Sequence, residues 1–219
     1  MNNLQKIGGI AALYLAAAYV VGIVLFLFVL DYPNIVDPAQ KVALIVDKQM
    51  VIYSTNLMLY VIFGVFLIVL ALALYERLKA SPPVIIQVAT AIGIIWAGSL
   101  VASGMVANAG IAPVVALYSK DPAQAALTWL GIETVASGLG NGNGEILGGL
   151  FTLLVSWAAL RIGGLPKALN YLGMVVGLVG IVSTIPSLND LVGVFAISQI
   201  VWFVWLGIIM SRQSPSKAV

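Results

Sequence analysis

Long apolar runs alternate with short polar segments along the whole chain. A helix of about 20 apolar residues crosses the ~30 Å hydrocarbon core of a bilayer, so each run is interpreted as one transmembrane helix. Helix-breaking prolines end several runs, as at Pro82-Pro83 and at Pro186. The pattern predicts an all-α fold, a polytopic transmembrane bundle of six helices. The expected spans cover residues 7–30, 50–75, 84–108, 145–160, 168–185 and 191–210.

The composition supports this class of protein. Hydrophobic residues make up 62% of the 219 residues and charged residues only 8%, which is too few charges to cover a water-exposed surface. We therefore expect a single transmembrane domain over residues 1–211, in contact with the lipid bilayer, and a polar tail at 212–219. Because no basic stretch is typical of a nucleic-acid site, no nucleic-acid partner is expected.

The sequence contains neither cysteine nor histidine. Their absence removes thiolate nucleophiles, imidazole bases and the usual protein ligands of haem, zinc and copper. No cofactor and no metal site are therefore expected, and catalysis within the membrane is disfavoured.

Lysine and arginine are distributed unevenly between the two predicted sides of the membrane. Cytoplasmic segments of multi-pass proteins carry an excess of these residues. Placing both termini in the cytoplasm leaves seven basic residues inside and three outside, which predicts a multi-pass protein of the cytoplasmic membrane with this threading. The inner residues are Lys6, Arg77, Lys79, Arg161, Lys167, Arg212 and Lys217, and the outer residues are Lys41, Lys48 and Lys120.

The motif Asp-Pro-Ala-Gln occurs twice, at residues 37–40 and 84 positions later at 121–124, and the same offset relates Pro82 to Pro166. Aspartate caps a helix and proline suits its first turn, so each copy should begin a short interfacial helix on the outer side. Duplicated two-helix hairpins would form a parallel repeat, unlike the inverted repeats of many transporters.

The second copy of the motif opens an apolar stretch, residues 121–140, whose placement the pattern leaves open. The stretch fits an interfacial helix, a re-entrant segment or an additional span. An additional span would carry Glu133 inward and weaken the charge bias.

Polar side chains gather at the predicted outer ends of the spans. They fit the lining of an outward-open vestibule, or, alternatively, ordinary interfacial residues that bond neighbouring helices. The candidate ligand-binding residues are Asn56, Asn108, Glu133, Asn141, Asn143, Glu145 and Asp190.

Glu145 has two interpretations of its own. It follows a stretch rich in glycine and asparagine and begins the fourth span, where the helix dipole favours an anion by about 0.3–1 kcal/mol. This is a structural explanation. In a vestibule, the carboxylate would instead point inward, toward the other outer polar groups.

Small residues recur every three or four positions in the fifth span, at Gly173, Gly177 and Gly180. Such stripes let helices approach closely. They predict close packing within the bundle or, alternatively, association with a membrane partner or a second copy of the chain as a homo-oligomer.

Residues 161–167, with the sequence Arg-Ile-Gly-Gly-Leu-Pro-Lys, precede Leu172-Gly173 and a glycine-spaced span, and residues 7–10 read Ile-Gly-Gly-Ile. These segments resemble an uncharacterised family of small bacterial six-span integral membrane proteins, a domain of unknown function. The resemblance implies the six-span layout and no activity. Span two departs from the family pattern, because Asn56 stands where an acidic residue is expected.

Two functions of different classes remain open at this stage. The first is a non-catalytic membrane module that binds a partner or lipid. The second is a small-molecule or ion transporter or channel with an outward-facing anionic vestibule. An enzyme that acts on a lipid head group through Glu133 and Glu145 ranks third.

Overall fold

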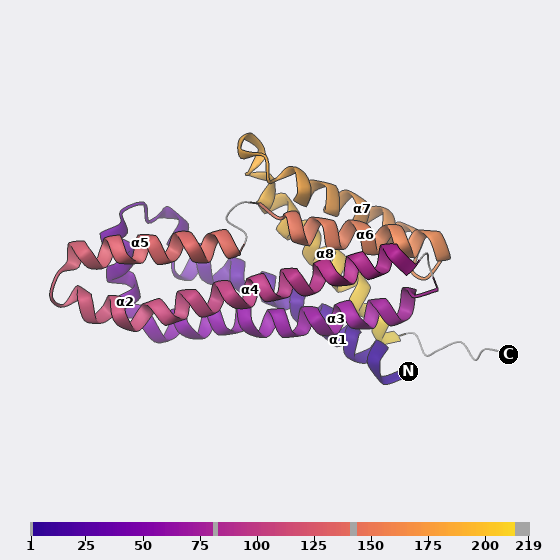
Figure 1. Ribbon diagram of the computed structural model, residues 1–219, viewed down its shortest axis with the longest axis horizontal. Helices are drawn as coiled ribbons and strands as arrows, with labels where there is room; N and C mark the ends of the chain where they lie inside the picture. The colour runs from indigo at the N-terminus through magenta and orange to yellow at the C-terminus, as the bar shows by residue number, and fades with distance from the viewer. Residues whose placement is uncertain (1, 81–82, 141–143, 213–219) are drawn as a thin grey trace. The chain divides into compact units, whose positions relative to one another are not determined.

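The computed structural model describes residues 2–80, 83–140 and 144–212, and these residues form an all-α structure (Figure 1). Two π-helical segments, Val24–Val29 and Leu57–Ile62, and two short 3-10 turns, Tyr32–Asn34 and Pro186–Leu188, join or extend the helices. The helices are α1 (Asn2–Ile23), α2 (Pro38–Asn56), α3 (Phe63–Leu78), α4 (Pro83–Tyr118), α5 (Pro122–Leu139), α6 (Ile146–Ile162), α7 (Lys167–Val182) and α8 (Leu191–Arg212).

Four continuous helical segments are long and apolar enough to cross a membrane, which indicates a multi-pass membrane protein. Two further apolar helices, α6 and α7, have only 17 and 16 residues. The number of crossings therefore stays a prediction. The four long segments are Asn3–Val29, Pro38–Leu78, Val84–Tyr118 and Leu191–Arg212.

The two long connections expected between spans are largely helical, in part where the repeated motif predicted helices and in part where no helix was expected. The connection expected at residues 31–49 contains the first half of α2, and the connection expected at 109–144 contains the end of α4 and all of α5. Residues 109–118 continue α4 because they are uncharged and rich in alanine and valine, and Pro113 is accommodated inside the helix. A proline therefore does not always end a helix in this chain.

The helix formed by α2, the second π-helical segment and α3 is too long to stand straight in a bilayer. Its 41 residues would extend about 61 Å, against 40–45 Å for a bilayer with its head groups. Lys48 interrupts it with non-helical backbone angles, φ −114° and ψ 23°. This break allows the part of α2 before Lys48 to point in a different direction from the part after it. An interfacial helix would require such a change of direction.

The described chain forms two compact units, and helices α1, α3 and α4 each contribute residues to both. The single domain predicted for residues 1–211 stays a prediction. Unit 1 consists of Met1–Ala17, Val65–Ala97 and Asn143–Val219, and unit 2 consists of Ala18–Gly64 and Gly98–Gly142.

Both copies of the repeated motif begin helices, as predicted. Asp37 caps α2 by accepting a hydrogen bond from the Ala39 amide at 3.0 Å, and Asp121 caps α5 by accepting one from the Gln124 amide at 3.0 Å. The first copy opens a long helix that continues past Lys48, and the second opens a helix of 18 residues. The first copy therefore does not form the separate helix that was expected, whereas the second does.

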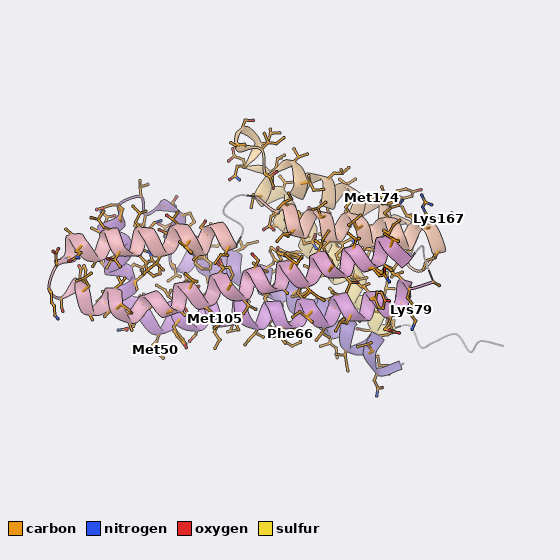
Figure 2. All side chains as sticks on the ribbon, viewed as in Figure 1. Met50, Phe66, Lys79, Met105, Lys167 and Met174 are labelled. Carbon is orange, nitrogen blue, oxygen red and sulfur yellow. The ribbon has the colours of Figure 1, made fainter. Side chains whose placement is uncertain are left out.

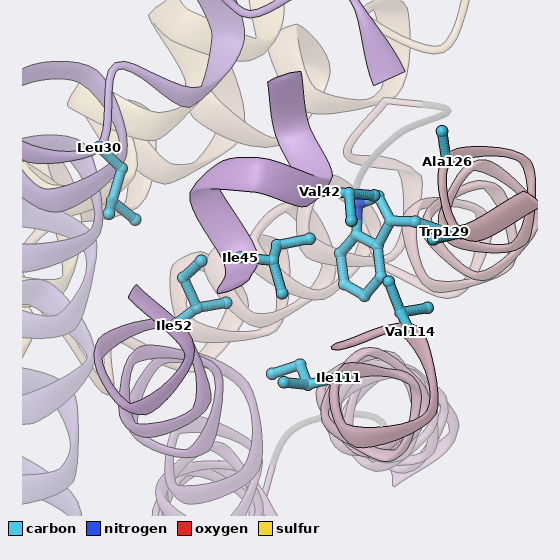
Figure 3. Close-up of a cluster of buried hydrophobic side chains, with 9 residues drawn as sticks. Leu30, Val42, Ile45, Ile52, Ile111, Val114, Ala126 and Trp129 are labelled. Carbon is cyan, nitrogen blue, oxygen red and sulfur yellow. The ribbon is translucent and has the colours of Figure 1, made fainter. Parts of the chain in front are cut away.

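The two copies also contribute matching residues to one hydrophobic core. Helices α2 and α5 pack together in unit 2, and their buried side chains form the cluster drawn in Figure 3 together with Leu30 and with Ile111 and Val114 of α4. Three pairs of residues in this cluster are 84 positions apart, which is the offset of the repeat. The pairs are Leu30 with Val114, Val42 with Ala126, and Ile45 with Trp129.

In unit 1, α6 and α7 touch through their backbones. A Cβ atom on Gly149 would lie 2.7 Å from the Gly177 carbonyl oxygen, and one on Gly177 would lie 2.7 Å from that of Gly149. On Gly180, a Cβ atom would lie 2.8 Å from the Phe195 ring of α8. The glycine stripe is thus used for packing inside the unit, and association with a second copy through it stays a prediction.

Candidate functional site

Two of the predicted site residues, Asn56 and Asn108, bind each other within unit 2. The Asn56 Nδ2 donates to the Asn108 Oδ1 at 3.0 Å, and the Asn108 Nδ2 donates to the Tyr53 carbonyl oxygen at 3.1 Å. Asn56 is 5% exposed. Side-chain amides that satisfy each other in this way bridge neighbouring helices, so this pair has a structural explanation.

A third predicted residue, Glu133 of α5, forms a salt bridge with Lys41 of α2. The Lys41 Nζ lies 2.8 Å from the Glu133 Oε1, and the two side chains are 21% and 24% exposed. The same Nζ lies 4.9 Å from the centroid of the Tyr32 ring. The Trp129 Nε1 donates to the Tyr32 hydroxyl at 3.0 Å. We call Tyr32, Lys41, Trp129 and Glu133 the outer cluster, after the side of the membrane predicted for them.

The electrostatics of the outer cluster keep Tyr32 neutral. Burial raises the pKa of the Tyr32 phenol well above its ordinary value, and the nearby negative charge of Glu133 raises it further. Lys41 supplies the positive charge that compensates Glu133. The cluster therefore contains one neutralised ion pair and no free charge. Its role is to hold α2 and α5 together.

Helix α5 is also fixed to α4 by two serines of a small-residue stripe. The Ser103 Oγ donates to the Ala136 carbonyl oxygen at 2.7 Å, and the Ser99 Oγ donates to that of Leu139. A hydroxyl that bonds a carbonyl of a neighbouring helix holds the two helices together in an apolar environment. Packing is therefore the role of this stripe.

The remaining described candidates lie in unit 1 and differ in environment. Glu145 is 4% exposed and does not cap its own helix α6, while its amide donates to the Ser183 Oγ at 3.1 Å. Gly144, with φ 89°, turns the chain into α6 in a conformation that favours glycine. Asp190 is exposed beside the start of α8. Asn141 and Asn143 lie outside the described residues.

The candidates are therefore divided between the two units, with Asn56, Asn108 and Glu133 in one and Glu145 and Asp190 in the other. In the described ranges, no group of three or more acidic, histidine or cysteine side chains is placed to hold a metal ion. The pairs that do form, Asn56 with Asn108 and Lys41 with Glu133, satisfy their members internally.

The sequence interpretation missed two polar networks in unit 1. The Arg77 Nε donates to the Gly164 carbonyl oxygen at 3.0 Å, and the Gln5 Nε2 donates to that of Ala73 at 2.9 Å. Figure 2 shows Lys79 and Lys167 at the same end of this unit. These two basic residues come from distant parts of the sequence, and the predicted threading places both in the cytoplasm.

The second network joins α6, α7 and α8. It contains Thr152 and Ser156, one turn apart on α6, and Gln199 and Trp202 on α8, all completely buried. The four-residue spacing of Thr152 and Ser156 was the available signal in the sequence. Their partners could not be inferred, because they lie more than forty residues away.

The fold and these sites define a multi-pass helical membrane protein in which most candidate polar groups are used to join helices. The chain belongs to the family described as Domain of unknown function (DUF4386), whose model matches residues 10–209. The predicted resemblance to a family without assigned function is confirmed, while the six-span layout and the bacterial origin stay predictions. No curated protein and no solved structure matches the chain.

Proposed function

We propose that the chain is a non-catalytic membrane module that binds lipid through unit 2, with the outward face of α5 as the contact surface. The observation that carries this proposal is the chemistry of that face. Leu127 is 70% exposed, Leu130 44% and Val135 55%. Large apolar side chains exposed together on one helix are typical of a surface that contacts lipid or a partner.

The polar groups on the same face are satisfied by the helix itself. The Thr128 Oγ1 donates to the Gln124 carbonyl oxygen at 2.8 Å, and the Thr134 Oγ1 donates to that of Leu130 at 2.7 Å. An unpaired hydroxyl is costly in hydrocarbon, whereas one that bonds its own backbone is tolerated there. These two threonines therefore add no free donor to the face.

The only charged residue of α5, Glu133, is paired with Lys41 of α2 in the outer cluster. The face is consequently free of net charge along most of the helix, which favours acyl chains over a polar protein surface. In this proposal, residues 121–140 form an interfacial helix or a re-entrant segment. They do not form an additional span.

Fluorescence quenching by lipids with brominated acyl chains tests the contact. A bimane label on Leu127→Cys or Leu130→Cys should be quenched several-fold more strongly in brominated than in ordinary vesicles, because these positions face outward. Ala125→Cys, at a position with 0% exposure, is the matched control and should label poorly. Equal quenching in both vesicles, together with rapid reaction of Leu127→Cys with a membrane-impermeant maleimide, would show a water-exposed face.

We further propose the threading predicted from the charge bias, with both termini in the cytoplasm and Lys120 outside. Lys120 follows α4 directly, and a cysteine there should react with a membrane-impermeant reagent in intact cells. Cysteines at Asn2 and Ser216 should react only after lysis. Labelling of either terminus in intact cells contradicts the threading.

A small-molecule or ion transporter with an outer anionic vestibule is the second candidate, and the burial of Glu145 favours it. Glu145 is 4% exposed at the start of an apolar helix, and an ionisable group at such a position is a candidate functional residue. Glu145→Gln keeps the shape and removes the charge. Vesicles containing this variant should lose cation-dependent uptake at least tenfold if the carboxylate binds cargo, with Asp190→Asn as the exposed control.

A further inference from the structure

We infer that α6, α7 and α8 enclose a binding site for a small neutral molecule, held through an acceptor oxygen in the interior of unit 1. The inference concerns the buried network of Thr152, Ser156, Asn170, Gly173, Gln199 and Trp202, which we call the inner polar cluster. It goes beyond the lipid-binding proposal and does not depend on it, because α5 belongs to the other unit.

The cluster is built as two successive levels between α6 and α8. At the first level, the Thr152 Oγ1 donates to the Gln199 Oε1 at 3.1 Å. At the second, a Cβ atom on Gly173 would collide with the Ser156 Oγ and lie 2.5 Å from the Trp202 Nε1. The two side-chain atoms are therefore neighbours, and glycine at position 173 is what leaves room for them.

Several polar atoms of the cluster have no hydrogen-bond partner among the described residues. They are the Ser156 Oγ, the Gln199 Nε2, the Trp202 Nε1 and the Asn170 Oδ1. Ser156, Gln199 and Trp202 are 0% exposed and Asn170 is 1% exposed. Buried polar groups in folded proteins are nearly always bonded, so orphaned atoms gathered in one core indicate an occupant that supplies the partners.

The chemistry of the unpartnered atoms defines the occupant. The serine hydroxyl, the glutamine amide and the indole are donors, and they require an acceptor oxygen. The occupant thus presents an acceptor oxygen to these donors, as water, an alcohol or an amide does.

The surroundings select a neutral occupant. Residues 146–160 of α6, 168–182 of α7 and 191–211 of α8 contain no charged side chain. An ion at this depth would lack a compensating charge, which is costly in a membrane protein. Water from the solvent and a small neutral solute share the required chemistry, and the experiment below distinguishes them.

The test uses the full-length protein in detergent micelles, with 15N label in the tryptophan indoles. The Trp202 signal is identified by its loss in Trp202→Phe, or in Trp202→Tyr if the first variant does not fold. We expect a downfield indole proton with a nuclear Overhauser contact to water. Added urea, the neutral probe with a carbonyl acceptor, should shift this signal if the site admits solutes and leave it unchanged if the occupant is water.

Substitutions separate a bound occupant from a direct bond between Ser156 and Trp202. With an occupant held also by Gln199, the downfield shift survives Ser156→Ala and disappears only in Ser156→Ala combined with Gln199→Met. Ser198→Ala is the control, because the Ser198 Oγ donates to the Val194 carbonyl oxygen outside the cluster. An upfield signal without contact to water or urea in the wild type, or loss of the shift in Ser156→Ala alone, would overturn the inference.

Discussion

The variant Gly177→Ala is expected to destabilise the chain strongly, although it adds only one methyl group. The added Cβ atom would lie 2.7 Å from the Gly149 carbonyl oxygen and 2.7 Å from the Leu153 amide nitrogen. Both are backbone atoms, which cannot rotate away as a side chain can. Overpacking of a core costs about 1–3 kcal/mol, and we expect a value at or above the upper end because two helices must separate.

Thermal unfolding in detergent measures this effect, and Gly131→Ala in α5 is the matched control. A Cβ atom on Gly131 meets no heavy atom within 4 Å. Alanine there should be neutral or stabilise by up to about 1 kcal/mol, since alanine is the better helix former. If both variants melt at the same temperature, the backbone contact between α6 and α7 is not formed as described.

Breaking the ion pair of the outer cluster should also destabilise the chain. Lys41→Met leaves the Glu133 carboxylate without its cation in a partly buried position, and the loss of a charged hydrogen bond costs about 1.5–3 kcal/mol. Glu133→Gln should cost less, because Lys41 keeps its contact with the Tyr32 ring. The double variant Lys41→Met/Glu133→Leu should recover most of the loss, since it leaves no unpaired charge.

A double-mutant cycle, measured by equilibrium unfolding in detergent, isolates the coupling between the two residues. The exposed pair of Lys79 with Glu76, at 2.7 Å, provides the control. Exposed ion pairs contribute about 0–1 kcal/mol, so Glu76→Gln should change stability little. A coupling between Lys41 and Glu133 no larger than that of the exposed pair would show that the outer cluster does not hold α5 against α2.

Much of the helical structure follows from the sequence because apolar runs and capping residues act locally. The starts of α2 and α5 were predicted correctly from the Asp-Pro motif, since the aspartate cap depends only on amides two or three residues away. The length of α4 was not predicted. Asn108 was taken as the end of a span, yet it lies inside a helix because Asn56, 52 residues away, satisfies its side chain.

The candidate site could be predicted less well, because polar residues acquire their role from distant partners. Glu133 was chosen as a free outer carboxylate, but Lys41, 92 residues earlier, neutralises it. Gln199 and Trp202 both belong to the sixth predicted span, and its apolar pattern gave no reason to pair them with α6. Residue type thus indicated which side chains are unusual in a membrane, and only tertiary packing shows what each one contacts.

The segments that contain the two motif copies contribute side chains to one shared hydrophobic core. Leu30, Val42 and Ile45 come from the first half of the chain, and their counterparts at the repeat offset, Val114, Ala126 and Trp129, come from the second. A fragment limited to the first hairpin would expose one half of this core and could bury it again only against another copy of itself. Unit 2 therefore needs segments from both halves of the chain to complete its core, and this core cannot close before the second copy of the motif is present.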